Sequence, residues 1–210
     1  MSQARDPMSI IGRRVALSEA GWRLSWHFRS LSAVPYLLAV PHCAQIEEMI
    51  EVRDECPLDW EAVYEAVSSA FGQLAEAELV KALREAGDSV LSLVAEEDGQ
   101  IVGHILLSRM EAPFPALALA PVSVIPARQR SDIGSALVKG AVNRACSEGW
   151  EAIFVLGDPE YYERFGFDRE AATGFTSPYA GTHFMVLELS PPLSARTGEL
   201  HHAPAFAALN

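Results

Sequence analysis

The stretch SVLSLVAEEDGQIVGHILLSR, residues 89–109, constrains the fold more than any other part of the chain. Two strand-like runs rich in valine, leucine and isoleucine are separated by Asp98-Gly99, a favoured two-residue turn between antiparallel strands. The next apolar run, ALALAPVSVIP over 116–126, is nearly all hydrophobic, which is typical of a central strand covered on both faces. These segments predict a sheet whose neighbouring strands begin as an antiparallel hairpin.

The spacing of apolar residues predicts the other elements. Residues 59–71 and 75–86 carry apolar side chains three and four apart, the period of amphipathic helices, and Gly87 ends the second helix. We expect Trp60 and Phe71 on the buried face of the first helix. The remaining expected elements are a first strand at 49–55, a helix at 133–149, a strand at 151–157, a short helix from Asp158-Pro159 to Gly166 and a strand at 183–189, followed by a looser tail from Pro191. Hairpin strands followed by a strand–helix–strand unit predict a mixed sheet and an α/β (α+β) fold.

Residues 1–48 differ from the rest of the chain in charge and pattern. They hold five Arg against four acidic residues, whereas residues 49–210 hold 11 Lys and Arg against 24 Asp and Glu. A signal peptide is disfavoured because the best apolar run, at 33–40, contains a proline and comes late. Trp22 and Trp26, four residues apart, allow an amphipathic helix on a membrane surface. We favour the simpler interpretation that 1–48 is an N-terminal extension or a misassigned start and that 49–210 form the functional domain.

The acidic composition limits the partners of the chain. Asp and Glu outnumber Lys and Arg by 28 to 16, so no nucleic-acid partner is expected, because phosphate binding needs a basic face. A negative field attracts cationic or amine-bearing molecules instead.

The chain has three cysteines, Cys43, Cys56 and Cys146, which are too far apart for a disulfide framework or a metal pair. Their number and spacing favour the reducing cytoplasm. We expect Cys146 to pack in the core. We also expect no metal and, without a run of about eighteen apolar residues, no membrane span.

The segment VSVIPARQRSDIGSAL, residues 122–137, is the strongest sign of a ligand site. It passes from the end of a strand through a polar loop into the start of a helix. Free backbone N–H groups at a helix start, together with Arg128 and Arg130, suit a phosphate group. Gly134 and Ser135 are small enough to let a ligand approach the backbone. On these residues alone, an ordinary helix start beside two arginines is an equally good interpretation.

Two motifs in sequence order resemble a known family. V-x-P-x-x-Q-x-x-x-I-G-S-A-L, from Val124 to Leu137, and LGDPEYYERFGF, at 156–167, resemble the GNAT family of N-acetyltransferases, and within it the bacterial YhbS-like branch. The resemblance covers roughly residues 49–189 and implies a mixed, mostly antiparallel central sheet flanked by helices, with acetyl-CoA as acyl donor. The strand at 120–124 would pair with the pantetheine arm and diverge from the strand at 153–156 to admit the thioester. The implied cofactor-binding residues are Val122, Ser123, Val124, Gln129, Arg130, Ser131, Asp132, Ile133, Gly134 and Ser135.

Asp132 departs from the family pattern Q/R-x-x-G-x-G/A, because it stands where the first glycine belongs. Its charge would repel a phosphate by roughly 4 kcal/mol at about 4 Å and an effective dielectric near 20, and by less in contact with water. Alternatively, Asp132 is an N-cap whose carboxylate occupies the amides that a phosphate would use. Since Arg128 and Arg130 would offset part of the charge, we expect weakened rather than abolished cofactor binding.

The resemblance also implies an acid for the reaction but names no base. Tyr162 lies in the family's aromatic motif, where a phenol near the sulfur can protonate the departing CoA thiolate. Its neighbour Tyr161 is expected to pack. The candidates for the base are His104, which we expect to be a core histidine with its hydrogen bonds satisfied, Glu111, which we expect to be exposed, and a chain of water molecules.

The function implied by the resemblance is transfer of an acetyl group from acetyl-CoA to a primary amine by direct attack in a ternary complex. The acceptor would be a small molecule or a peptide, and the sequence does not choose between them. The alternative is a non-catalytic acyl-CoA-binding or interaction module with a degenerate GNAT fold, an alternative that Asp132 favours. A homodimer is compatible with the sequence.

Overall fold

The computed structural model of this chain describes residues 50–209. The expectations for residues 1–48, including a membrane-surface helix at Trp22 and Trp26, lie outside the described residues.

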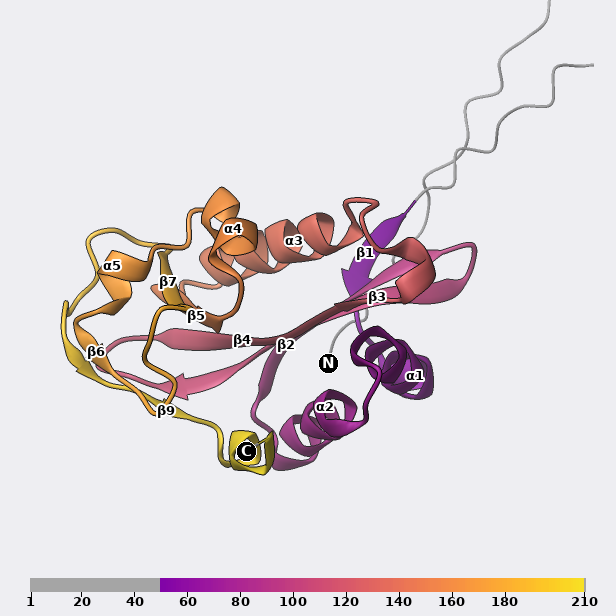
Figure 1. The fold of residues 1–210 in the computed structure, drawn as a ribbon, viewed down its shortest axis with the longest axis horizontal. Helices are drawn as coiled ribbons and strands as arrows, with labels where there is room; N and C mark the ends of the chain where they lie inside the picture. Colours follow the sequence, from indigo (N-terminus) through magenta and orange to yellow (C-terminus); the bar gives the residue numbers. More distant parts are fainter. Residues whose placement is uncertain (1–49, 210) are drawn as a thin grey trace, which may run out of the picture. The chain divides into compact units, whose positions relative to one another are not determined.

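The central element is a mixed sheet with the strand order β1-β2-β3-β4-β5-β7 (Figure 1). All neighbouring pairs on this path are antiparallel except β4 and β5, which are parallel. The short β9 (His201–His202) adds to the end of β3, and β6 (Phe175–Thr176) pairs with β8 (Gly198–Glu199) in a separate small sheet. The main strands are β1 (Glu51–Asp54), β2 (Ser89–Glu97), β3 (Gln100–Glu111), β4 (Ala116–Val124), β5 (Ala152–Leu156) and β7 (Phe184–Glu188).

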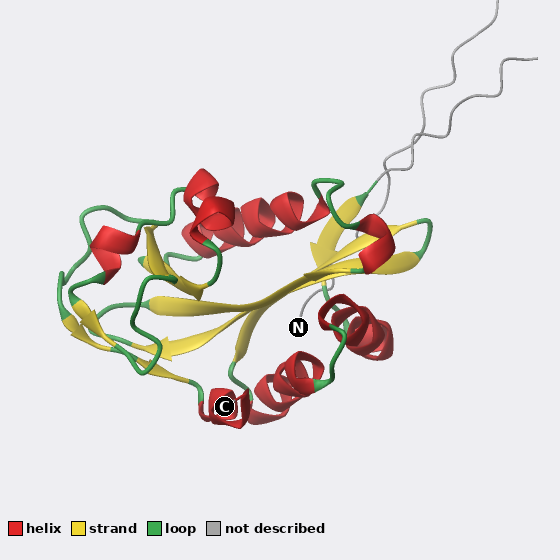
Figure 2. Ribbon diagram, viewed as in Figure 1, coloured by secondary structure: helices red, strands yellow, loops and turns green. Residues whose placement is uncertain are grey.

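Helices cover both faces of this sheet (Figure 2). The longer ones are α1 (Trp60–Phe71) and α2 (Ala75–Ala86) on one face and α3 (Ile133–Ser147) on the other. The short helical segments are η1 (Pro57–Asp59), η2 (Pro126–Arg128), α4 (Pro159–Tyr162), η3 (Glu163–Phe165), α5 (Arg169–Ala172) and η4 (Pro204–Leu209). The alternation of side chains along each strand divides the core in two: Leu106 and Phe154 belong to the core on the side of the sheet that carries α1 and α2, whereas Ile105 and Ile153 belong to the core on the side that carries α3.

The local signals of the sequence are confirmed at the turns. Asp98 and Gly99 join β2 to β3 with φ values of 50° and 77°, the left-handed conformation that a two-residue hairpin needs. Gly87 ends α2 in the same conformation, at φ 75°. The α/β architecture, a mostly antiparallel sheet flanked by helices, is the fold that was expected.

Three packing expectations are wrong. Trp60 and Phe71 are 49% and 42% exposed, because α1 turns its smaller residues Val63, Ala66 and Val67 toward the sheet. Cys146 is exposed, since its neighbour Ala145 takes the buried position on α3. The tail from Pro191 is also more ordered than expected: it contributes β8, β9 and η4, and it buries its apolar side chains Leu193, Leu200, Ala203 and Phe206 in the core beneath α1 and α2.

The feature that positions the site is a local irregularity in β4. Between the pairs Leu119–Leu107 and Val122–Ile105, β4 has one residue more than β3, which is a β-bulge. The parallel ladder between β4 and β5 ends at Leu119–Val155. Beyond this point, residues 122–124 remain paired with β3, and their other edge has no strand partner within 50–209.

In the described range, no helix is long and apolar enough to cross a membrane.

Candidate active site

A cavity of about 530 Å³ lies where the free edge of β4, the start of α3 and the short α4 come together. Its lining residues are Val122, Ser123, Val124, Gln129, Arg130, Asp132, Gly134, Ser135, Asp158, Tyr161, Tyr162 and Arg164. The two motifs of the sequence, about twenty residues apart, therefore meet in one hollow.

Most of the residues expected at a cofactor site line this cavity, and two do not. Ile133 is 1% exposed and packs in the core beneath α3. Ser131 lies on the outside of the loop, where its hydroxyl donates to the carbonyl of Arg128. The Gln129 side chain folds back to donate to the carbonyl of Val124 at 3.1 Å, which ties the loop to the end of the strand. The side chains of Ser131 and Ile133 therefore hold the loop in place and do not line the cavity.

The loop between β4 and α3 contains two residues in the left-handed conformation, Arg130 at φ 63° and Asp132 at φ 61°. This region favours glycine, and among other residues aspartate and asparagine enter it most readily. The backbone at position 132 therefore explains why a glycine suits this position and why an aspartate can replace it.

Asp132 is the N-cap residue of α3 by position, but its carboxylate makes no capping hydrogen bond. The first backbone bond of the helix is donated by Ala136 to the carbonyl of Asp132, at 2.9 Å. The amides of residues 133–135 precede this bond, so they are available to an anion at the positive end of the helix. The alternative in which Asp132 blocks these amides is therefore wrong in this conformation.

Two arginines bring positive charge to the cavity, but only one of them was expected. Arg130 lines it, as does Arg164, whose guanidinium lies 4.2 Å from the centre of the Tyr161 ring and donates to the Ser135 hydroxyl at 3.0 Å. Arg128, which was expected to offset Asp132, instead forms an ion pair with Glu97 of β2 and does not line the cavity.

Tyr162 comes from α4 and is 7% exposed. Its ring packs directly on the backbone at Gly157, where a Cβ atom would come within 2.4 Å of it. The Tyr162 ring also makes an edge-on contact with the ring of Phe167, with 5.5 Å between the ring centres. Burial, with a smaller contribution from Tyr161, raises the pKa of Tyr162 well above its usual value. The phenol is therefore protonated at neutral pH.

Sequence reasoning missed the roles of Tyr161, Arg164 and Asp158 as cavity residues. The Tyr161 hydroxyl lies over the start of α3, so close that a Cβ atom at Gly134 would be 2.7 Å from it. The spacing of three between Tyr161 and Arg164 places both on one side of a helical turn, a signal that could have linked them. Asp158 caps α4 as expected, accepting from the amide of Glu160 at 3.1 Å.

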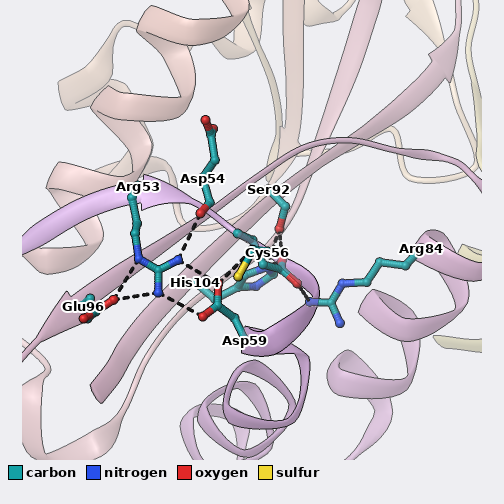
Figure 3. Close-up of polar contacts among 9 residues, drawn as sticks. Arg53, Asp54, Cys56, Asp59, Arg84, Ser92, Glu96 and His104 are labelled. Carbon is teal, nitrogen blue, oxygen red and sulfur yellow. Dashed lines mark hydrogen bonds and ion pairs between the residues drawn. The ribbon is translucent and has the colours of Figure 1, made fainter. Parts of the chain in front are cut away.

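His104 is fully buried in β3, as expected, and lies on the side of the sheet covered by α1 (Figure 3). Its Nε2 atom is 2.8 Å from the hydroxyl of Ser92 and 3.1 Å from the Glu55 carboxylate.

Glu111 is exposed at the end of β3. Among residues 50–209, no group of three or more His, Cys, Asp or Glu side chains could hold a metal ion.

Comparison with known proteins relates this chain to a family. A model of the Acetyltransferase (GNAT) family matches residues 60–167. The chain is 36% identical to the uncharacterized N-acetyltransferase YjhQ of Escherichia coli over 56% of its own length and 69% of that protein. A crystal structure of the N-acetyltransferase YhbS from E. coli in complex with CoA is 29% identical, has a TM-score of 0.71, and covers 75% of this chain and 92% of that one. A GNAT acetyltransferase from Brucella melitensis in complex with acetyl-CoA is 33% identical, with a TM-score of 0.66 and coverages of 76% and 99%.

Proposed function

The chain belongs to the Acetyltransferase (GNAT) family, and we propose that its cavity binds acetyl-CoA and transfers the acetyl group to a primary amine. The observation that carries this proposal is the meeting of three features in one cavity: an uncapped helix start, a free strand edge and a buried, protonated tyrosine. CoA and acetyl-CoA are bound by the related proteins of E. coli and B. melitensis, respectively.

The cofactor would lie along the cavity with its pyrophosphate on the start of α3. The amides of residues 133–135 would donate to the phosphates, and Arg130 and Arg164 would supply positive charge. The pantetheine arm would extend along residues 122–124, which pair with β3 on one side only. It would form hydrogen bonds with the free backbone edge of these residues, as an added strand does.

The thioester would then enter the space that opens between β4 and β5 beyond Leu119. In a ternary complex, the amine nitrogen attacks the thioester carbon, and a backbone amide of β4 near the bulge stabilises the negative oxygen. As the carbon–sulfur bond breaks, Tyr162 donates its proton to the CoA thiolate. This role is supported by the position of Tyr162, which is buried and lines the cavity.

The acceptor is proposed to be a cationic amine, either a small molecule or a peptide. Residues 49–210 carry 24 acidic against 11 basic side chains, so the field around the domain attracts positive charge. The compartment proposed is the cytoplasm, because the free cysteines of the described range, Cys56 and Cys146, are exposed and suit reducing conditions. A homodimer stays a prediction.

A second candidate function is favoured by one residue. Asp132 places a negative charge on the cavity wall beside the proposed phosphate site. A chain that binds acyl-CoA weakly and transfers nothing would be a non-catalytic interaction module with the same fold.

The test is a screen of amines with detection of the released thiol. Amino acids, polyamines, aminoglycosides and lysine-containing peptides are incubated with acetyl-CoA and either the wild-type chain or Tyr162→Phe. Thiol release that depends on one amine and falls in the variant supports acetyl transfer. Binding of acetyl-CoA without thiol release from any amine favours the non-catalytic module.

A further inference from the structure

Two side chains of the cavity, Tyr161 and Arg164, lie against the start of α3. Tyr161 belongs to α4, and Arg164 belongs to η3, the segment that continues α4. Figure 1 shows α4 beside α3. The charge of Arg164 has a part in the proposed function, but the hydroxyl of Tyr161 and the contact between the two residues have none.

The Tyr161 hydroxyl is a hydrogen-bond donor without an acceptor. The ring is partly buried and packs edge-on against Tyr162, with 5.0 Å between the ring centres. Among residues 50–209, the hydroxyl takes part in no hydrogen bond, although it lies in the cavity wall. A tyrosine hydroxyl in a partly buried position usually has a partner, so this one is available to a ligand.

The position of this hydroxyl places it within reach of an anion on the helix start. It lies 2.7 Å from the point that a Cβ atom would occupy at Gly134. A Cβ atom is about 2.5 Å from the amide nitrogen of its own residue, so the hydroxyl is at most about 5 Å from the Gly134 amide. Because each hydrogen bond spans about 2.8 Å, one phosphate group can accept from both donors.

The guanidinium of Arg164 is held by aromatic rings and keeps its donors free. It lies 4.2 Å from the centre of the Tyr161 ring and 4.8 Å from the centre of the Phe165 ring. Such contacts use the flat face of the group, so its N–H groups remain available at the edges. One of them donates to the Ser135 hydroxyl at 3.0 Å, and in the part of the chain that the structure describes Arg164 has no carboxylate partner. The remaining N–H groups suit the oxygens of a phosphate.

On the basis of the proposed function, we propose that Tyr161 and Arg164 form a clamp on the pyrophosphate of acetyl-CoA, and that this clamp makes the site specific for acyl donors that carry phosphate. The amides of residues 133–135 bind the phosphates from the helix, and the Tyr161 hydroxyl and the Arg164 guanidinium bind them from α4 and η3. The pantetheine arm lies along residues 122–124 in the proposed complex and needs neither side chain. The clamp therefore adds nothing to the binding of a donor without phosphate.

Tyr161→Phe and Arg164→Gln test the clamp with two donors, acetyl-CoA and acetylpantetheine, which lacks the pyrophosphate. Tyr161→Phe keeps the ring that contacts Arg164 and Tyr162, so it removes the hydroxyl alone. In calorimetric titrations, the dissociation constant of acetyl-CoA should rise about three- to tenfold in Tyr161→Phe and ten- to a hundredfold in Arg164→Gln, the usual effect of losing hydrogen bonds to a charged group. The dissociation constant of acetylpantetheine, measured by NMR at millimolar concentrations, should be the same in both variants as in the wild type.

Arg169→Gln is the matched control. Arg169 is an exposed arginine of the next helix, α5, but it pairs with Glu163 at 2.9 Å and does not line the cavity. Removing its charge should leave the affinity for both donors unchanged. An equal loss of acetyl-CoA affinity in Arg169→Gln and Arg164→Gln would reveal a general effect of charge and overturn the proposal. Wild-type acetyl-CoA affinity in the two clamp variants, or a loss as large for acetylpantetheine as for acetyl-CoA, would overturn it as well.

Failure of the proposed function gives a different result from failure of the clamp. If the wild type binds acetyl-CoA but no amine releases thiol, acetyl transfer is refuted, and the titrations above still decide whether Tyr161 and Arg164 bind the phosphates. A clamp that fails alone leaves acetyl-CoA binding and thiol release intact in the wild type. A wild-type chain that does not bind acetyl-CoA refutes both.

Discussion

Replacing Asp132 by glycine should strengthen acetyl-CoA binding. The Asp132 carboxylate lines the cavity beside the amides of residues 133–135, where the pyrophosphate is proposed to bind, and it makes no capping bond that would turn it away. Asp132 is exposed, so its charge is partly screened by water. At about 6 Å and an effective dielectric near 40, Coulomb's law gives roughly 1.4 kcal/mol of repulsion per phosphate charge, or about a tenfold change in affinity.

The same substitution should change the stability of the ligand-free protein by less than about 1 kcal/mol. No cap is lost, because the side chain caps nothing. Glycine relieves the left-handed conformation at φ 61°, but its greater freedom in the unfolded chain offsets the gain. The free protein should therefore melt close to the wild-type temperature, and acetyl-CoA should raise Tm more in Asp132→Gly than in the wild type.

The assay is calorimetric titration of acetyl-CoA at low and at high salt. The gain in affinity should shrink as salt rises, because screening weakens the repulsion. Asp98→Gly is the matched control: it removes the same charge from a left-handed aspartate, at φ 50°, in the hairpin turn and outside the cavity lining. Unchanged or weaker binding in Asp132→Gly, or an equal gain in Asp98→Gly, would refute the reasoning.

The other predictions concern acid catalysis, pH and the N-terminal segment. Tyr162→Phe should lower kcat about 10²- to 10⁴-fold and leave the acetyl-CoA affinity unchanged, because the lost group donates a proton and binds nothing else; loss of affinity at constant kcat would place Tyr162 in binding instead. Burial lowers the pKa of His202 to about 4, so the folded state binds fewer protons than the unfolded state between that pH and 6.5, and stability must fall as pH drops through this window. Discounted for partial exposure, the part of the loss due to His202 is roughly 1–2 kcal/mol; denaturant titrations at both ends of the window should find the total loss smaller by this amount in His202→Gln than in the wild type, because burial lowers the pKa of His104 as well. A chain beginning at Met49 should unfold within about 3 °C of the full-length chain in calorimetry, since residues 50–209 enclose both cores; insoluble protein would place residues 1–48 in the fold.

The architecture could be predicted from the sequence because its signals are local. The Asp98-Gly99 turn, the glycine after α2 and the apolar run of β4 each act within a few residues, and together they leave few sheet topologies. The buried face of α1 could not be predicted in the same way. Whether Trp60 or Ala66 faces the sheet depends on how closely the helix approaches, and only the packed structure decides this.

In the candidate site, too, the residues set by local sequence could be predicted, and those that depend on the packing of distant segments could not. The loop at 129–135 and Tyr162 could be found because their motifs are contiguous in sequence. The spacing of Arg164 from Tyr161 could have linked these two residues to each other, but not to the cavity, since the contact of Arg164 with Ser135 across 29 residues exists only after η3 lies against α3. The uncapped state of Asp132 also depends on a backbone angle that residue type alone does not determine, because aspartate is common both as a helix cap and in the left-handed region.

The central claim is that acetyl-CoA binds with its pyrophosphate at the start of α3 and its thioester beside Tyr162. A crystal structure of the chain with acetyl-CoA tests it most directly. The account predicts phosphate oxygens within hydrogen-bond distance of the amides of residues 133–135, pantetheine paired with residues 122–124, and the sulfur facing the Tyr162 hydroxyl. A cofactor bound elsewhere on the domain, or a sulfur far from Tyr162, would contradict it.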